Sequence, residues 1–269
     1  MMRSLLLIPL LLTSSWLSGT DLKPWFPRYL EFQSTFTYLH QQYCDVNEGT
    51  RTIYWKSKDD FYTAGLELAY DDYCGELECT FSSTRRHHLG PDNIKATLRY
   101  QILDDIIGDP VSLVAGVTVA QVFSLSLKDI STFHHGNLEG EFHLSIGKEC
   151  PCYDTWRSRW WSVAGIGLGD HGSPWLHGEF AWEYNWFDRQ RVRIYALGIY
   201  GLGDENLDVF LFDGYGPIMH QSIDFGSMYR YTFTCDGSLS IGYAHRLHAR
   251  NCPSHANIYY ISYHYPFGL

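Results

Sequence analysis

The sequence predicts an all-β fold, a single antiparallel transmembrane β-barrel of about 12 strands. Two observations lead to this prediction. First, several segments alternate apolar and polar residues at every second position, which is the pattern of a strand with one face in lipid and the other in a lumen. Second, the chain has 20 Tyr, 9 Trp and 15 Phe, an aromatic share of 16%. Aromatic residues favour strands, and they also gather at the two interfaces of a membrane barrel.

The alternation is clearest in four segments: Tyr62–Tyr70, Ile94–Ile102, Leu138–Ile146 and Leu176–Trp186. In Ile94–Ile102, for example, Leu98 belongs to the apolar set and Arg99 to the polar set. Weaker alternation predicts nine further strands: Glu31–Tyr43, Gly75–Ser83, Val111–Ser124, Arg159–Leu168, Arg191–Leu202, Leu207–Phe212, Ser222–Phe233, Ser238–Leu247 and Asn257–Leu269. Single-chain barrels of bacteria use even numbers of strands, so one of these assignments is in excess and 12 is expected.

Connections of two kinds separate the strands. Turn-forming residues in Asp104–Pro110 and Asp188–Gln190 predict short turns at one end of the barrel. Longer polar segments, Lys128–Asn137, Lys148–Trp156 and Gly203–Asn206, are expected at the opposite, external end, where barrel loops are longer.

Residues 1–20 have the features of a cleaved signal peptide. Arg3 supplies a positive charge, Leu5–Leu12 an apolar run that is too short to span a bilayer, and Thr20 a small residue before the cleavage point. Residues 21–269 are then one barrel domain. The chain has a formal net charge of −10, which opposes binding to phosphates, so nucleic acid is excluded as an expected partner.

The end of the chain resembles the C-terminal insertion signal of bacterial outer-membrane proteins. Apolar or aromatic residues occupy every second position, at Ile261, Tyr263, Tyr265, Phe267 and Leu269. The terminal residue departs from the usual Phe, and Pro266 removes a hydrogen-bond donor from the strand. This resemblance implies a location in a bacterial outer membrane, with membrane lipid and the barrel-assembly machinery as partners.

Cysteine usage carries a second, compositional resemblance, to the cysteine-bearing envelope proteins of chlamydia-type bacteria. In such envelopes, disulfides link neighbouring proteins. The candidate disulfide residues are Cys44, Cys74, Cys79, Cys150, Cys152, Cys235 and Cys252. Their odd number leaves at least one without an internal partner, so a bridge to another protein, a free thiol and, less favoured, a metal ligand all stay open.

The polar faces of the predicted strands give the functional prediction. Nine of their charged or titratable residues are expected to line the lumen: Lys95, Arg99, Glu139, Glu141, His143, Glu179, Glu183, Arg191 and Arg193. A hairpin turning at Asp188 would set Glu183 opposite Arg193. We therefore expect a narrow pore for small hydrophilic solutes, without metal or cofactor. The pore is either open along its length or gated by the loop that carries His134 and His135.

Three alternatives remain. The first is a structural or surface-exposed barrel without conductance, which could be disulfide-linked to its neighbours. The second is a lipid-modifying outer-membrane hydrolase, suggested by His171 and Ser173, although the surrounding sequence matches neither the phospholipase nor the lipid A deacylase family, and no catalytic residue is assigned. The third is a secreted, aromatic-rich β-sandwich.

Overall fold

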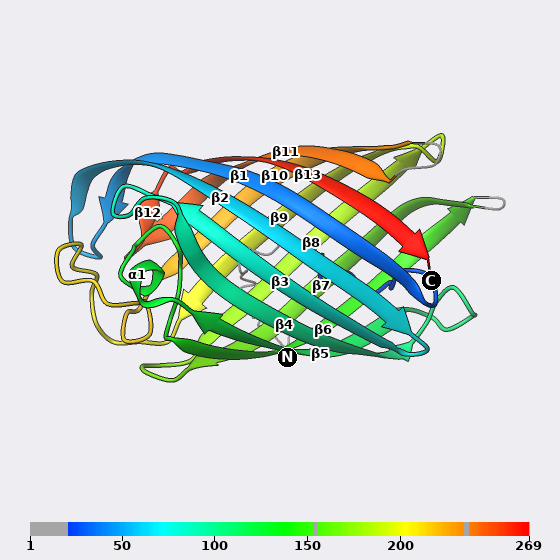
Figure 1. Ribbon diagram of the computed structural model, residues 1–269, viewed down its shortest axis with the longest axis horizontal. Helices are drawn as coiled ribbons and strands as arrows, with labels where there is room; N and C mark the ends of the chain where they lie inside the picture. Colours follow the sequence, from blue (N-terminus) through cyan, green and yellow to red (C-terminus); the bar gives the residue numbers. More distant parts are fainter. Residues whose placement is uncertain (1–20, 153–154, 234–236, 269) are drawn as a thin grey trace, which may run out of the picture.

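The computed structural model describes residues 21–152, 155–233 and 237–268, which form a closed antiparallel β-barrel (Figure 1). Within these residues, twelve long strands follow one another around the wall, and the two-residue β12 (Pro253–Ser254) pairs with one end of β1. The long strands are β1 (Glu31–Asn47), β2 (Thr52–Tyr70), β3 (Tyr73–Ser83), β4 (Gly90–Leu103), β5 (Ser112–Val122), β6 (Leu138–Cys152), β7 (Thr155–Gly169), β8 (Trp175–Trp186), β9 (Gln190–Gly201), β10 (Gln221–Thr232), β11 (Ser238–Arg250) and β13 (Asn257–Gly268). The predicted signal peptide, residues 1–20, lies outside the described residues.

The barrel closes where the first and last strands meet. β1 pairs with β2 on one side and with β13 on the other, and the rings of Phe32 and Phe267 stack across that seam with their centroids 5.4 Å apart. Closure removes the unpaired backbone groups of an open sheet edge, which a lipid environment could not satisfy. The predicted fold class and the predicted number of strands are both confirmed.

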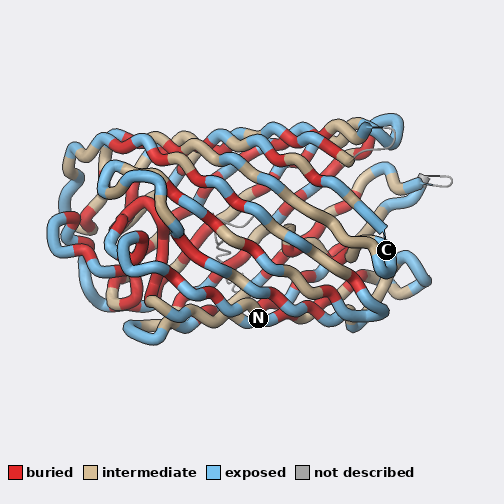
Figure 2. The backbone as a smooth tube through the Cα atoms, viewed as in Figure 1, coloured by how far each residue is buried: buried red, intermediate tan, exposed pale blue. Residues whose placement is uncertain are grey.

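Burial alternates along the strands as the sequence pattern predicted (Figure 2). On β4 the exposed fraction is 59% for Leu98 and 1% for Arg99. The same holds on β8, where Phe180 and Trp182 are exposed and Glu183 is fully buried. An apolar outer face and a polar inner face are what a strand between hydrocarbon and a lumen requires.

The two ends of the barrel differ. At the short-turn end, β2 and β3 are joined by a tight turn, and β8 and β9 by another in which Phe187 and Asp188 adopt positive φ angles. The opposite, loop end carries the longer connections, including the one-turn helix α1 (Ser124–Leu127) and the segment 202–220 (Figure 1). The predicted turns at Asp104–Pro110 and Asp188–Gln190 both lie at the short-turn end.

Two sequence assignments were wrong. Leu207–Phe212 is not a strand: it belongs to the long connection between β9 and β10, and Leu207, Val209 and Phe212 are buried in a cluster of apolar side chains. Lys148–Trp156 is not an external loop, because β6 extends to Cys152 and β7 begins at Thr155, and these strand ends lie at the short-turn end.

Residues 21–30 precede β1, and residues 21–27 among them lie in the barrel interior. Trp25 is 4% exposed and packs edge-on against Trp161 of β7, with ring centroids 6.0 Å apart. Gly147 of β6 permits this approach, since a Cβ atom at that position would lie 2.9 Å from the side chain of Pro24. No helix in the described part of the chain is long and apolar enough to cross a membrane.

Candidate functional site

Charged side chains meet inside the barrel, towards its short-turn end, on the inner face of β7, β8 and β9. Glu183 is 0% exposed and lies between two arginines: its Oε1 accepts a hydrogen bond from Arg159 Nη2 at 3.0 Å, and its Oε2 accepts one from Arg193 Nε at 3.1 Å. The strand register sets Glu183 opposite Arg193, as predicted, and Asn185 opposite Arg191. Buried charges are stable only when they are paired in this way or hydrated.

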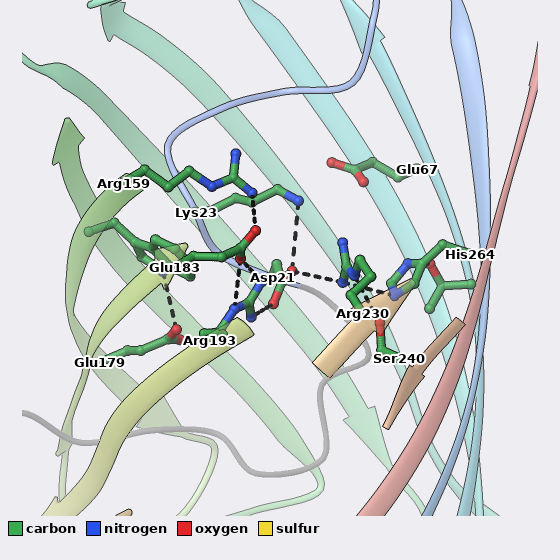
Figure 3. A network of polar contacts seen from close by, with 12 residues as sticks. Asp21, Lys23, Glu67, Arg159, Glu179, Glu183, Arg193, Arg230, Ser240 and His264 are labelled. Atoms are coloured by element: carbon green, nitrogen blue, oxygen red, sulfur yellow. Dashed lines mark hydrogen bonds and ion pairs between the residues drawn. The ribbon is translucent and has the colours of Figure 1, made fainter. Parts of the chain in front are cut away.

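The N-terminal segment completes this cluster (Figure 3). The Asp21 carboxylate accepts hydrogen bonds from Arg193 Nη1 and Nη2 at 2.5 and 2.8 Å, and lies 3.5 Å from Arg230 Nη2 of β10. Lys23 Nζ lies 3.7 Å from the same carboxylate. We call Asp21, Lys23, Arg159, Glu183, Arg193 and Arg230 the arginine network.

A second set of ion pairs lies on the inner faces of β2, β3, β4, β6 and β8. Arg99 Nη2 lies 2.5 Å from Glu67 Oε1, and Lys95 pairs with Glu78. His177 Nδ1 lies 2.5 Å from Glu141 Oε1. We call this set the glutamate wall; it contains Glu67, Glu78, Lys95, Arg99, Glu141 and His177.

The nine residues proposed to line the lumen therefore separate into groups. Glu183 and Arg193 meet in the arginine network, and Glu179 is hydrogen-bonded nearby to Trp161 Nε1 at 3.1 Å. Four belong to or border the glutamate wall: Lys95, Arg99, Glu141 and His143. The other two lie apart, Glu139 near the loop end and Arg191 near the short-turn end.

Sequence reasoning missed several members of these clusters. Arg159 and Arg230 alternate with apolar neighbours on β7 and β10, so a fuller count of alternating positions would have found them. Asp21 and Lys23 could not have been found in this way, because they precede the first strand and carry no strand pattern.

A cavity of about 480 Å³ opens at the short-turn end. Its lining includes the charged side chains of Asp105, Glu149 and Arg191, together with Trp156 and Asn185. It is large enough for a small solute and lies next to the arginine network, because Glu149 also pairs with Arg159 at 3.3 Å.

The loop end is filled differently, by apolar side chains from the loops and from the adjoining ends of β1 and β9. Phe133 and Tyr215 stack with ring centroids 4.9 Å apart, and Tyr215 is 0% exposed. They belong to an apolar cluster that we call the loop plug: Tyr43, Val46, Ile130, Phe133, Ile199, Leu207, Val209, Phe212, Tyr215, Ile218, Cys252 and Ala256.

Three histidines border the loop plug. His134 Nε2 lies 3.1 Å from Asp92, and although burial lowers its pKa, the carboxylates of Asp92 and Glu139 raise that pKa to about 10. His135 Nε2 lies 3.2 Å from His220 Nε2. Burial lowers the pKa of both His135 and His220. The charge of His134 lowers the pKa of His135 further, and His135 lowers the pKa of His220 further.

The cysteines are dispersed. Cys44 and Cys150 are exposed, Cys79 is half-buried, and Cys74 and Cys252 are buried. No disulfide joins any two of these five, the cysteines whose side chains the structure describes. The side chain of Cys152 and the whole of Cys235 lie outside the described residues. The resemblance to chlamydia-type envelope proteins therefore gains no support.

The structure does not bring the residues of the hydrolase alternative into a described contact. His171 is an exposed loop residue whose Nδ1 lies 3.2 Å from Asp170, whereas Ser173 is tied through its backbone amide to the carbonyl of Gly216. Across the described ranges, 21–152, 155–233 and 237–268, no group of three or more His, Cys, Asp or Glu side chains could hold a metal ion.

Comparisons with known proteins extend this description. No family model matches the sequence, and no curated protein matches it. Among solved structures, the chain is similar to the COG4313 outer membrane channel from Pseudomonas putida F1, with a TM-score of 0.67, 10% identity and coverage of 92% of this chain and 99% of that one. It is also similar to the KdgM porin (TM-score 0.51, 9% identity, 87% and 99% covered) and to the translocator domain of the autotransporter NalP from Neisseria meningitidis (TM-score 0.51, 9% identity, 88% of each chain covered). At these identities the likeness concerns the fold, and the chain has the fold of the bacterial outer-membrane β-barrels.

Proposed function

We propose that this chain forms a narrow pore for small hydrophilic solutes in a bacterial outer membrane. The observation that carries the proposal is the charged interior. The arginine network and the glutamate wall lie inside a barrel whose outer face is apolar. An envelope anchor would need only a packed core, whereas ion pairs that hydrate readily suit a path for polar solutes.

The width of the barrel fits a narrow pore. Eight-stranded barrels are filled by their own side chains, and barrels of 16 to 18 strands enclose a wide aqueous channel. Twelve strands fall between these cases. The charged side chains and residues 21–27 take up part of the interior, so a solute passing through would meet the arginine network at close range.

We propose that the barrel-assembly machinery inserts this barrel into the outer membrane and recognises its C-terminal strand. On β13, Ile261, Tyr265 and Phe267 are exposed on the outer face, which is the pattern expected of a strand read by the barrel-assembly machinery. Leu269 lies outside the described residues.

A non-conducting envelope barrel is the second candidate, and the loop plug favours it. Apolar side chains from the β5–β6 and β9–β10 connections fill the loop end of the interior. Among the five cysteines whose side chains are described, Cys44 and Cys150 are exposed, and in this case their thiols would be available for bridges to neighbouring proteins.

Single-channel conductance of the chain refolded without residues 1–20 in a planar bilayer distinguishes the two candidates. A pore gives discrete current steps, and Glu183→Gln, which removes a negative charge from between two arginines, lowers the preference for cations. Asp213→Asn is the matched control, because it removes the same charge from an exposed loop residue. Circular dichroism verifies that each variant is folded. Insertion without current would support the closed barrel and overturn the pore.

A further inference from the structure

The Asp21 carboxylate occupies a seat that is made for a carboxylate. Arg193 binds it in a bidentate manner: Nη1 donates to Oδ1 at 2.5 Å and Nη2 donates to Oδ2 at 2.8 Å (Figure 3). Arg230, on the next strand, places its Nη2 3.5 Å from Oδ2. Two parallel N–H···O bonds from one guanidinium are the geometry by which arginine recognises a carboxylate specifically. We call Arg193 and Arg230 the carboxylate seat.

The two arginines are held in place by groups other than Asp21. Arg193 Nε donates to Glu183 at 3.1 Å, and the guanidinium lies over the ring of Trp161, 4.7 Å from its centroid. Arg230 Nε donates to Ser240 Oγ at 2.8 Å, and its Nη2 lies 3.1 Å from His264 Nε2. The seat is therefore preorganised and would keep its shape if Asp21 withdrew.

Charge around the seat favours an anion. If the segment that carries Asp21 and Lys23 withdrew, four guanidinium groups would remain near one another, against three carboxylates: those of Arg159, Arg191, Arg193 and Arg230 against those of Glu149, Glu179 and Glu183. Burial strengthens the resulting attraction, because little water is present to screen it.

The segment that brings Asp21 to the seat belongs to no strand. Residues 21–27 precede β1, and their contacts with the wall include a hydrogen bond from Arg99 Nη1 to the carbonyl of Lys23 and one from Trp25 Nε1 to Asp105. Such a segment can leave its place without breaking a backbone ladder of the barrel.

We propose that the carboxylate seat binds the carboxylate group of a small organic acid, and that Asp21 occupies the seat as an internal competitor. This inference rests on the proposed function, because the acid must enter the lumen to reach the seat. It names the solute class of the pore: small monocarboxylates, recognised by Arg193 and Arg230 in place of the chain's own carboxylate.

The test measures binding and current separately. Acetate, the isolated counterpart of the aspartate side chain, is titrated into the refolded barrel in deuterated detergent, and saturation-transfer NMR follows its methyl signal. Asp21→Asn removes the competing carboxylate and should tighten acetate binding about tenfold. This gain in affinity corresponds to one charge-assisted hydrogen bond, which acetate no longer has to take from Asp21. Adding Arg230→Gln should reverse the gain, and Arg193→Lys, which keeps the charge but loses the fork, should also reverse it. Asp213→Asn is the control that should change nothing.

Each outcome decides the inference. Equal acetate binding by the parent chain and Asp21→Asn would overturn it, as would displacement of acetate by chloride at equal concentration, since a general positive field does not distinguish the two anions. In the planar bilayer, acetate should reduce the current of Asp21→Asn at lower concentrations than in the parent chain. Acetate binding with the expected pattern but no current would support the carboxylate seat and refute the pore. Current without any change in acetate binding among the variants would support the pore and refute the carboxylate seat.

Discussion

The short-turn side of the barrel interior and the loop end share one wall but are filled in opposite ways. On the short-turn side, charged side chains face one another, with Glu183 between Arg159 and Arg193. At the loop end, aromatic and aliphatic side chains form the loop plug around Tyr215. An ion pair can exchange one partner for a solute of the same charge and keep its charges compensated, whereas a packed apolar cluster must lose its contacts to open.

This difference assigns different tasks to the two regions. The arginine network is suited to discriminate among solutes, since its geometry recognises charge and shape. The loop plug is suited to control access, because it consists of connections that can move while the strands stay paired. Substitutions in the loop plug, on the outer face of the wall and at the His135–His220 contact test this division.

The largest effect is expected at the loop plug. Tyr215→Ala removes a fully buried ring that stacks on Phe133 and donates a hydrogen bond to the carbonyl of Ile130 at 2.7 Å. Loss of a large buried aromatic side chain costs about 3–5 kcal/mol. Amide hydrogen exchange should accelerate in residues 203–220 but not in the strands around the arginine network. Leu211→Ala, an exposed change in the same connection, is the control. Uniform acceleration would contradict the division into two regions.

The next effect concerns the wall that surrounds both regions. Leu98→Arg puts a charge on the outer face of β4, where we expect a cost of about 2–4 kcal/mol near the bilayer midplane. Urea titration of the refolded barrel in lipid vesicles measures it. Leu125→Arg, on the exposed side of α1 at the loop end, should cost almost nothing. Similar costs for the two variants would mean that the exposed face of β4 is not in contact with lipid.

The smallest effect is a pH dependence confined to the loop end. The pKa values of His135 and His220 are lowered in the folded protein, so protons bind the opened loops better, and the plug loses stability as the pH falls below about 6.5. His134 acts in the opposite sense: its raised pKa stabilises the plug below about 6.5, and this contribution is lost as the pH rises towards about 10. The groups that face the pair are His134, Asp92 and Glu139.

Hydrogen exchange of residues 203–220 at pH 7.5 and at pH 5, corrected for intrinsic rates, measures the acid branch. His135 stacks on Trp175 with ring centroids 3.8 Å apart. His135→Phe keeps an aromatic ring in this position, but the phenylalanine ring cannot take up a proton. The acid sensitivity should shrink in this variant. Equal sensitivity in the variant and the parent chain would exclude the His135–His220 contact as its source.

The strands could be predicted from the sequence because a lipid environment requires apolar and polar residues to alternate strictly along each membrane-spanning strand. Leu98 and Arg99 are assigned to opposite faces by a rule that needs no knowledge of the fold, and the Glu183–Arg193 pairing followed from one hairpin turn. The rule failed where strands leave the membrane. β6 and β7 continue through Lys148–Trp156, where polar residues are tolerated on both faces, so the segment resembled a loop.

The segments that fill the interior without belonging to a wall strand could not be predicted from the sequence. Leu207–Phe212 is apolar because it belongs to the loop plug, and a short apolar run of this kind is indistinguishable from a strand by pattern alone. Asp21 reaches Arg193 across 172 positions of the chain, and nothing in its local sequence indicates that contact.

The inward course of residues 21–27 has a practical consequence for handling the protein. A purification tag or fluorescent label fused directly ahead of Asp21 would have to be housed inside the barrel, beside Trp25 and Arg193, or would draw the segment out of it. A label intended to leave the interior undisturbed belongs instead at Leu211, which is 81% exposed at the loop end.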